Sequence, residues 1–318
     1  MKRTIYLIAI IGFIITTPLF FCSPKNMQPD NEIALGKQLF FDSILSSTYK
    51  LSCASCHKPE FAFADTSAVS SGVHNRRGVR NTPSAMNVSN AAFFFWDGRA
   101  ATLEEQALMP ISNPVEMNLP VDSAVRRLQQ SKFYSKAFQK IFGQKPSAKN
   151  LGKALAAFQN SMETSDSPFD DWKVNENEAA ISASAKRGFE LFNGKANCVR
   201  CHFGSDFSNN ELRNIGLYDG KNLNDSGRSA ITNLTADIGK FKIGPLRNIA
   251  LTAPYMHNGM FKTLREVIEY YNEPDKVVPN SINRDSLLAK PLHLSEKEKN
   301  DMENFLRSLT SKSLVAKR

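Results

Sequence analysis

Two short stretches of the sequence repeat one pattern of thiols and an imidazole: CASCH at residues 53–57 and CVRCH at residues 198–202. A bare CxxC occurs in zinc sites and redox pairs, but CxxC followed directly by histidine is the attachment sequence of c-type haem. The two thiols add to the vinyl groups of one porphyrin, and the adjacent imidazole then lies beneath the iron as its proximal ligand. The sequence therefore predicts two covalently attached c-type haems. The residues that would hold them are Cys53, Cys56 and His57, and Cys198, Cys201 and His202.

A third stretch, PYMHNGMFKTLREVIEYYN at residues 254–272, holds more candidate iron ligands than one site can use. Its donor-bearing residues are Met256, His257, Met260, Tyr270 and Tyr271. Thr263 and Glu266 have the spacing of a capping box, which predicts a helix that begins near Leu264. Helical periodicity then puts Tyr271 on the inward, apolar face and leaves Tyr270 off it. Tyr271 is therefore either a packed core aromatic or an iron ligand, with Met260 as a second candidate ligand.

The elements that must position these residues occur twice in the chain. GKQLF precedes the first haem motif and GFELF precedes the second. RNTPSAMN and then WDGRAATLEE follow the first motif, whereas RNIALTAPYM and then HNGMFKTLRE follow the second. Strand patterns are sparse, and helical periodicity marks the segment between the copies. We therefore expect a mainly α protein with two cytochrome c-like haem domains in tandem, joined by a helical connector.

The two copies differ where a second iron ligand could lie. Pro110 of the first copy aligns with Tyr271, and a proline side chain has no donor atom. Gln106 aligns with Val267, so a polar amide replaces an apolar side chain. One haem thus gains a candidate sixth ligand, while the other has an open position beside an amide. The difference indicates one electron relay and one reaction site.

The N-terminal residues have the pattern of an export signal. Lys2 and Arg3 precede an uncharged run over residues 4–21, which Cys22 and a polar stretch follow. Cys22 is placed like the acylated cysteine of bacterial lipoproteins, although Phe21 stands where a small residue is usual. Lipid anchoring at Cys22, a cleaved soluble form and an uncleaved membrane anchor all remain open. Each of them puts the body of the protein on the periplasmic side.

Composition sets further bounds on the protein. The 318 residues are 42% hydrophobic and 22% charged, which favours a packed globular core. The formal net charge of +9 lacks the interleaved basic and aromatic block of a nucleic-acid surface, so nucleic acid is excluded as a partner. The expected divisions are an export segment at 1–21, a polar tether at 22–32, an N-terminal haem domain at 33–165 and a C-terminal haem domain at 166–318.

Over residues 33–310 the chain resembles the bacterial dihaem cytochrome c peroxidases, a family that includes the MauG-type enzymes. The motifs that carry the resemblance are FFDSILS, CASCH, RNTPS, FFWDGRAATLEEQA, NPVEM, CVRCH and LRNIALTAPYMHNG. The resemblance implies a peroxidatic N-terminal haem and an electron-transferring C-terminal haem. It also implies that Trp96 lies between the haems, that Glu116 is the distal acid–base group and that Gln106 lies beside it. From the residues alone, Glu116 would be a solvated loop carboxylate, and Trp96 would be either a packed core residue or an electron relay.

Further ligands follow from the same resemblance. Asn81 and the backbone carbonyls of Thr252 and Pro254 correspond to a calcium site between the haems. His74 lies where peroxidases that need reductive activation carry a loop histidine on the N-terminal iron; a surface loop role is the alternative. Well-studied peroxidases have methionine at the Tyr271 position, whereas MauG has tyrosine.

Three functions compete at this point. The leading one is the reduction of hydrogen peroxide to water, with electrons from a small cytochrome c or cupredoxin that enter at the C-terminal haem and pass to the N-terminal haem. The second is a MauG-like oxidase that modifies a protein or small molecule, and the third is a dihaem electron carrier without turnover. An open N-terminal iron with Gln106 and Glu116 beside it argues against the carrier. The oligomeric state stays open, with a homodimer among the options.

Overall fold

The computed structural model describes residues 28–316. The expected export segment at 1–21 and the acylation candidate Cys22 lie outside the described residues. Within residues 28–316, no helix has the length and apolar character needed to cross a bilayer.

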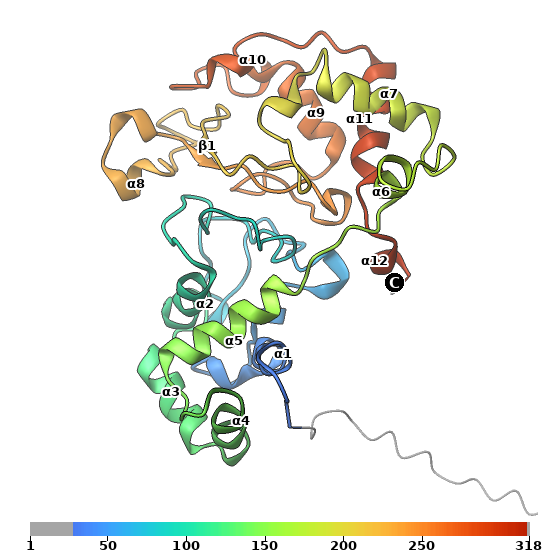
Figure 1. The fold of residues 1–318 in the computed structure, drawn as a ribbon. Helices are drawn as coiled ribbons and strands as arrows, with labels where there is room; N and C mark the ends of the chain where they lie inside the picture. The colour runs from blue at the N-terminus through green and yellow to red at the C-terminus, as the bar shows by residue number, and fades with distance from the viewer. Residues whose placement is uncertain (1–27, 317–318) are drawn as a thin grey trace, which may run out of the picture.

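Helices dominate the described chain, and sheet is confined to one short antiparallel pair, as the mainly α expectation requires (Figure 1). The helices are α1 (Glu32–Phe41), α2 (Leu103–Ser112), α3 (Val121–Gln130), α4 (Lys132–Phe142), α5 (Ala148–Asn160), α6 (Pro168–Lys173), α7 (Ala183–Asn193), α8 (Ser229–Thr232), α9 (Leu264–Asn272), α10 (Pro274–Val277), α11 (Glu296–Ser308) and α12 (Lys312–Val315). The strands are β1 (Leu212–Arg213) and β2 (Phe241–Lys242). Long loops and single turns of 3-10 helix connect them, and two of these turns carry the haem motifs.

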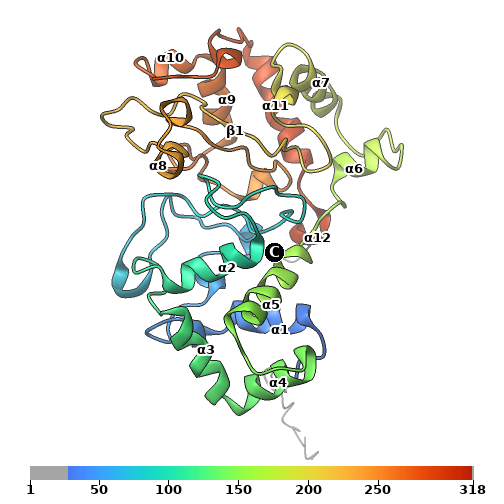
Figure 2. The same cartoon turned by 60° about the vertical axis from the view of Figure 1, so that its left-hand side comes forward.

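The N-terminal half is one packed unit around the contact of α1 with α5. Gly36 of α1 is essential to this contact, since a Cβ there would come within 1.8 Å of the Ala154 carbonyl oxygen. Leu35, Leu39 and Phe40 of α1 are almost fully buried in the shared core. The helices α3 and α4 pack onto the same core, so the segment expected to connect the copies contributes its helices to this unit (Figures 1 and 2).

The C-terminal half repeats the arrangement with α7 and α11. A Cβ at Gly188 of α7 would come within 2.0 Å of the Asp301 carbonyl oxygen of α11. Gly188 therefore permits the same close helix contact that Gly36 permits between α1 and α5. Phe305 of α11 is fully buried among four aromatic rings of this unit. The GKQLF and GFELF segments thus form equivalent helices, and the second copy lacks counterparts of α3 and α4.

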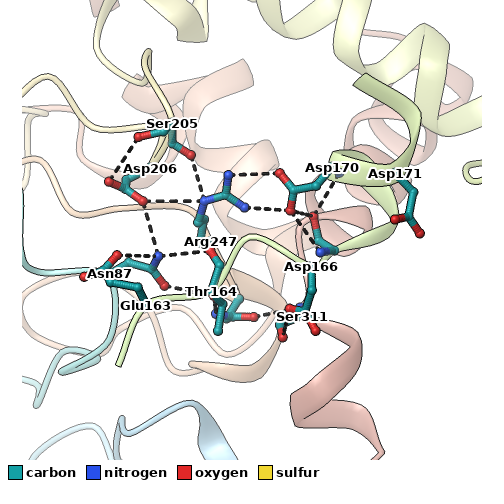
Figure 3. A network of polar contacts seen from close by, with 12 residues as sticks. Asn87, Glu163, Thr164, Asp166, Asp170, Asp171, Ser205, Asp206, Arg247 and Ser311 are labelled. Atoms are coloured by element: carbon teal, nitrogen blue, oxygen red, sulfur yellow. Dashed lines mark hydrogen bonds and ion pairs between the residues drawn. The ribbon is translucent and has the colours of Figure 1, made fainter. Parts of the chain in front are cut away.

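A polar network joins the two units behind the second haem motif (Figure 3). The Arg247 guanidinium donates to both oxygens of Asp170, at 2.9 and 3.0 Å, and its Nε donates to the Ser205 carbonyl. The side chains of Arg247 and Asp170 are both less than a tenth exposed. Asp206 accepts a hydrogen bond from Asn87 of the N-terminal unit. The buried Arg247–Asp170 pair lies within the C-terminal unit, and the Asn87–Asp206 hydrogen bond connects this network to the N-terminal unit.

An ion pair crosses between the units near the expected haem interface. Arg80 of the N-terminal unit donates through Nε and Nη2 to the two oxygens of Asp225, at 2.7 and 2.8 Å. It also donates to Asp97 at 2.5 Å. A fork of this kind fixes orientation as well as distance.

The last described helix returns to the first unit. Leu314 of α12 packs against the N-terminal core cluster. The Ser311 amide before this helix donates to the Asn248 side chain at 2.8 Å, and the Ser311 hydroxyl donates to Asp166. The C-terminal segment therefore contacts both units and the link between them.

Replacing Gly188 with alanine is expected to lower the free energy of unfolding by about 1–3 kcal/mol, the usual cost of overpacking. The added methyl would meet a backbone carbonyl that cannot move aside, and this outweighs the better helix propensity of alanine. Urea unfolding of haem-loaded protein measures the change. Gly78→Ala is the control, because nothing lies within 4 Å of a Cβ there. Equal midpoints for the two variants would contradict the close contact of α7 with α11.

Candidate haem sites and the interface between them

Both CxxCH motifs adopt the same local fold. Each begins with a turn of 3-10 helix, η3 (Cys53–Ser55) and η6 (Cys198–Arg200), and the histidine amide donates to the carbonyl of the first cysteine at 2.9 Å in both. No disulfide joins the four cysteines of the two motifs. Burial raises the pKa of the Cys53 and Cys198 thiols to about 12. The four sulfur atoms are therefore available for thioether bonds to haem.

The two imidazoles are oriented alike by backbone carbonyls. Nδ1 of His57 lies 2.9 Å from the Phe63 oxygen, and Nδ1 of His202 lies 2.8 Å from the Phe207 oxygen. Burial lowers the pKa of both histidines, so the neutral ring donates from Nδ1 and keeps the Nε2 lone pair free. This is the tautomer that a metal-ligating histidine needs. The residues present therefore fit two haems, whose chemistry is electron transfer and peroxide activation at iron.

The same residues do not suit zinc. Within residues 28–316 no group of three or more His, Cys, Asp or Glu side chains is placed to hold a metal ion. A structural zinc site needs four such donors.

The distal side of the first motif is built by α2 and the loop after it. Thr102 caps the helix, and its hydroxyl accepts from the Glu105 amide. The chain then folds back, and the Met117 amide donates to the Pro110 carbonyl at 3.2 Å. This turn brings Glu116 beside Pro110, the position that Tyr271 holds in the second copy.

The Glu116 carboxylate interacts electrostatically with the first haem motif. Its charge contributes to raising the pKa of Cys53 and Cys56, so it lies within electrostatic range of both thiols. Burial raises the pKa of Glu116 itself, which the Asn113 hydrogen bond at 2.7 Å and the nearby Arg99 partly oppose. A carboxyl group with a raised pKa is a better proton acceptor than an ordinary carboxylate and can return the proton in a later step.

Gln106 and His74 have different surroundings on this side. Gln106 is half-buried on α2, and its side chain makes no hydrogen bond to any described residue. The His74 side chain is exposed, in a left-handed backbone conformation with φ 56°. Its loop is nevertheless attached to the same region, because the Val73 amide donates to the Glu116 carbonyl at 2.8 Å. Ligation of iron by His74 stays a prediction.

In the second unit α9 begins at Leu264 behind the Thr263 capping box, as expected. The Tyr271 hydroxyl makes no hydrogen bond to a described residue, and its pKa is raised by burial and also by Cys198 and Cys201. Tyr271 therefore has a free phenol near the second haem motif. The expectation for Tyr270 was wrong: its side chain is fully buried, and its hydroxyl donates to the Ile215 carbonyl at 2.5 Å. The end of a short helix leaves no solvent-facing side at this position, because the loop at Ile215 covers it.

Two other donors of this stretch, Met260 and His257, contact protein groups. The Met260 sulfur accepts a hydrogen bond from the Asn258 amide at 3.7 Å. The buried His257 ring is stacked on Phe241, with ring centroids 3.7 Å apart, and meets the edge of Trp96. Burial lowers the pKa of His257 to about 4, so the ring is neutral.

Trp96 lies at the contact between the two units. Its indole Nε1 donates to the Asn81 carbonyl at 2.8 Å, and the Asn81 amide donates to the His257 carbonyl at 2.6 Å. The Lys242 amide of β2 donates to the Trp96 carbonyl at 2.7 Å. The indole is thereby held by residues of both copies, which fits a residue between two haems.

The candidate calcium ligands Asn81, Thr252 and Pro254 each have an oxygen that accepts no hydrogen bond from a described residue. Asn81 is buried and donates its side-chain amide to the Ser67 and Ala68 carbonyls at 3.3 Å, which leaves its amide oxygen free. Neither the Thr252 nor the Pro254 carbonyl accepts a hydrogen bond from a described residue. Carbonyl and amide oxygens of this kind are ligands that calcium prefers.

Two similar helical units, each with a thiol pair and an oriented imidazole, define a tandem dihaem protein of the cytochrome c type. Comparison with known proteins agrees. The family model described as di-haem cytochrome c peroxidase matches residues 30–179. The Methylorubrum extorquens "Methylamine utilization protein MauG" is 39% identical over 90% of this chain and 80% of its own length. The chain belongs to the dihaem cytochrome c peroxidase and MauG family, a family of haem-dependent oxidoreductases, and its cofactors are two c-type haems.

Two further proteins are similar to this chain over most of its length. The Nitrosomonas europaea "Cytochrome c551 peroxidase" is 36% identical over 77% of this chain and 74% of its own length. The crystal structure of a MauG-like protein associated with microbial copper homeostasis superposes with a TM-score of 0.82 at 30% identity, covering 96% of this chain and 97% of that one. The likeness therefore extends through both haem units and the expected tandem fold is confirmed.

Proposed function

We propose that the protein reduces hydrogen peroxide to water at its N-terminal haem, with electrons that enter at the C-terminal haem from a small cytochrome c or cupredoxin. The observation that carries the proposal is the difference between the copies. The second copy puts the free Tyr271 phenol near its haem motif. The first puts Pro110 at the same position and the Glu116 carboxylate beside it.

The chemistry matches these side chains. Each peroxide takes up two electrons and two protons and leaves as two water molecules. Cleavage of the O–O bond needs a proton moved from one oxygen to the other, which Glu116 can do from a partly buried position with a raised pKa. Gln106, with its unpaired amide, can donate a hydrogen bond that orients the peroxide. Trp96, held by both units, is the side chain through which electrons would pass between the sites.

The remaining parts of the proposal concern ions, domains and location. Asn81, Thr252 and Pro254 would hold a calcium ion that stiffens the contact between the haems. The division at residue 165 falls between α5 and α6, where the chain passes from one core to the other. Export to the periplasmic side and tethering through Cys22 rest on the sequence pattern at the N-terminus.

A second candidate is a MauG-like oxidase that acts on a protein or small molecule. Two observations favour it: tyrosine at position 271 and the 39% identity to a relative named MauG. No described feature marks a docking site for a particular protein substrate, so the peroxidase is the first choice.

Steady-state turnover separates the candidates. The haem-loaded protein is mixed with hydrogen peroxide and a pre-reduced small cytochrome c, and donor oxidation is followed by absorbance. We expect two donor molecules oxidised per peroxide, at a rate that saturates with both substrates. Slow donor oxidation together with rapid peroxide-dependent loss of an added aromatic substrate would favour the oxidase instead.

A further inference from the structure

Lys242 of β2 is a lysine without an acidic partner at the contact between the two units. Its backbone amide donates to the Trp96 carbonyl, so it lies at the centre of the interface. The side chain is partly buried and makes no ion pair or hydrogen bond with a described residue. Its ammonium lies 5.7 Å from the ring centroid of Phe94, a buried residue of the N-terminal unit.

The environment of this lysine is unfavourable in the protein alone. Burial lowers the pKa of Lys242 to about 8, and no acidic group opposes that shift. One aromatic face contributes only about 0.5–2 kcal/mol to a cation, less than the usual cost of removing an unpaired ammonium from water. Such a group needs an anion that the described residues do not provide.

Lys240, on the same extended segment, is a lysine that does have an acidic partner. It lies two residues earlier and so points to the same side of the extended chain as Lys242. Its ammonium is 3.1 Å from the Asp237 carboxylate. Of these two neighbouring lysines, Lys242 is the one that lacks an acidic partner among the described residues.

Each haem brings two propionate carboxylates, which must lie in the protein without leaving unpaired charge. We propose that Lys242 is the counter-ion of a propionate of the N-terminal haem and so helps to set the reduction potential of that haem. The ammonium reaches from the C-terminal unit into the N-terminal one beside Phe94, so it can pair across the interface. The proposal rests on haem attachment alone and does not depend on which substrate the enzyme oxidises or reduces.

The consequence is electrostatic. A cation beside the haem favours the ferrous form, because the ferrous iron carries one positive charge less than the ferric iron. Removing the lysine charge therefore favours the ferric form. A lysine from one unit then tunes the electron acceptor in the other. Lys242 is a positioning residue in this role, because it touches the propionate and not the peroxide.

Spectroelectrochemical titration of the haem-loaded protein tests the proposal, with the two haems resolved by their absorption and electron paramagnetic resonance signals. In Lys242→Met we expect the ferrous-to-ferric ratio of the N-terminal haem at a fixed potential to fall about tenfold, a shift of about 59 mV. The reduction potential of the C-terminal haem should change much less. Lys242→Arg keeps the charge, so the potentials of both haems should stay close to those of the parent. Lys240→Met should also leave them close to the parent, because the Lys240 ammonium is paired with Asp237 and not with a propionate.

Three outcomes would overturn the proposal. In Lys242→Met, the reduction potential of neither haem changes, or only that of the C-terminal haem changes. Alternatively, Lys240→Met changes the potential of the N-terminal haem by the same amount. If Lys242→Met fails to attach both haems, as judged by mass, Lys242→Gln gives the same comparison with a polar side chain. Unchanged potentials overturn the proposal whether or not the variant still turns over peroxide, since only the potentials bear on it.

Discussion

Replacing Glu116 with glutamine is expected to leave both haems attached and to lower peroxide turnover by about 10²–10⁴-fold, the usual contribution of a general acid–base group. Glutamine has the same shape and can keep a hydrogen bond to Asn113, but it cannot take up and release the proton that O–O cleavage requires. The measurement is kcat with a reduced donor protein, together with the mass of the loaded chain. Glu104→Gln is the control, because that carboxylate is exposed on α2, the helix that precedes the Glu116 loop.

The pH dependence of peroxide turnover provides a second test of the role of Glu116. The pKa of Glu116 is raised by burial, so its deprotonated form, which accepts the first proton, is lost as the pH falls through a value above that of an ordinary glutamate. Activity should therefore decline on the acid side at a higher pH than a free carboxylate would give. Asn113→Ala removes a hydrogen bond that lowers this pKa and should move the decline to still higher pH. Turnover of Glu116→Gln within a few-fold of the parent would show that another group moves the proton.

Replacing Tyr271 with phenylalanine is expected to change the spectrum and the potential of the C-terminal haem. The substitution keeps the ring and removes only the hydroxyl, which has no described hydrogen-bond partner and lies near Cys198 and Cys201. If the phenol is the sixth ligand, electron paramagnetic resonance of the ferric protein should show loss of the six-coordinate low-spin signal. Tyr271→Met should raise the potential toward that of a His/Met cytochrome.

Tyr270 provides a matched control for that experiment. It is the next residue on the same helix, and its hydroxyl already donates to the Ile215 carbonyl. Tyr270→Phe should cost roughly 1 kcal/mol of folding free energy, the usual net value of one hydrogen bond, and leave the haem spectrum unchanged. An unchanged spectrum in Tyr271→Phe with a changed one in Met260→Leu would assign the ligand to Met260.

Much of the fold and both haem motifs were predictable because they depend on local patterns. The CxxCH spacing is set by the porphyrin, and the capping box before Leu264 satisfies backbone groups within one turn. The repeat was visible because Gly36 and Gly188 are both required by the same close helix contact. These features need no knowledge of distant residues.

The unpredictable parts depend on the backbone or on distant contacts. The carbonyls of Phe63 and Phe207 orient the proximal imidazoles, and no side-chain type marks them in the sequence. Tyr270 was misplaced because helix periodicity cannot report a loop 55 residues away that covers its hydroxyl. Lys242 looked like any surface lysine, since only the folded interface shows that its charge lacks a partner. Sequence periodicity reports one helix face at a time, whereas these roles arise where two units meet.

The return of α12 to the first unit affects how the chain assembles. Synthesis delivers the N-terminal residues first, and a domain generally folds as its residues emerge. Leu314 packs against the N-terminal core, however, and Ser311 is bonded to Asn248 and Asp166. The first unit therefore acquires the Leu314 contact only after the second unit has been made, so the packing of the first unit is completed after synthesis of nearly the whole chain.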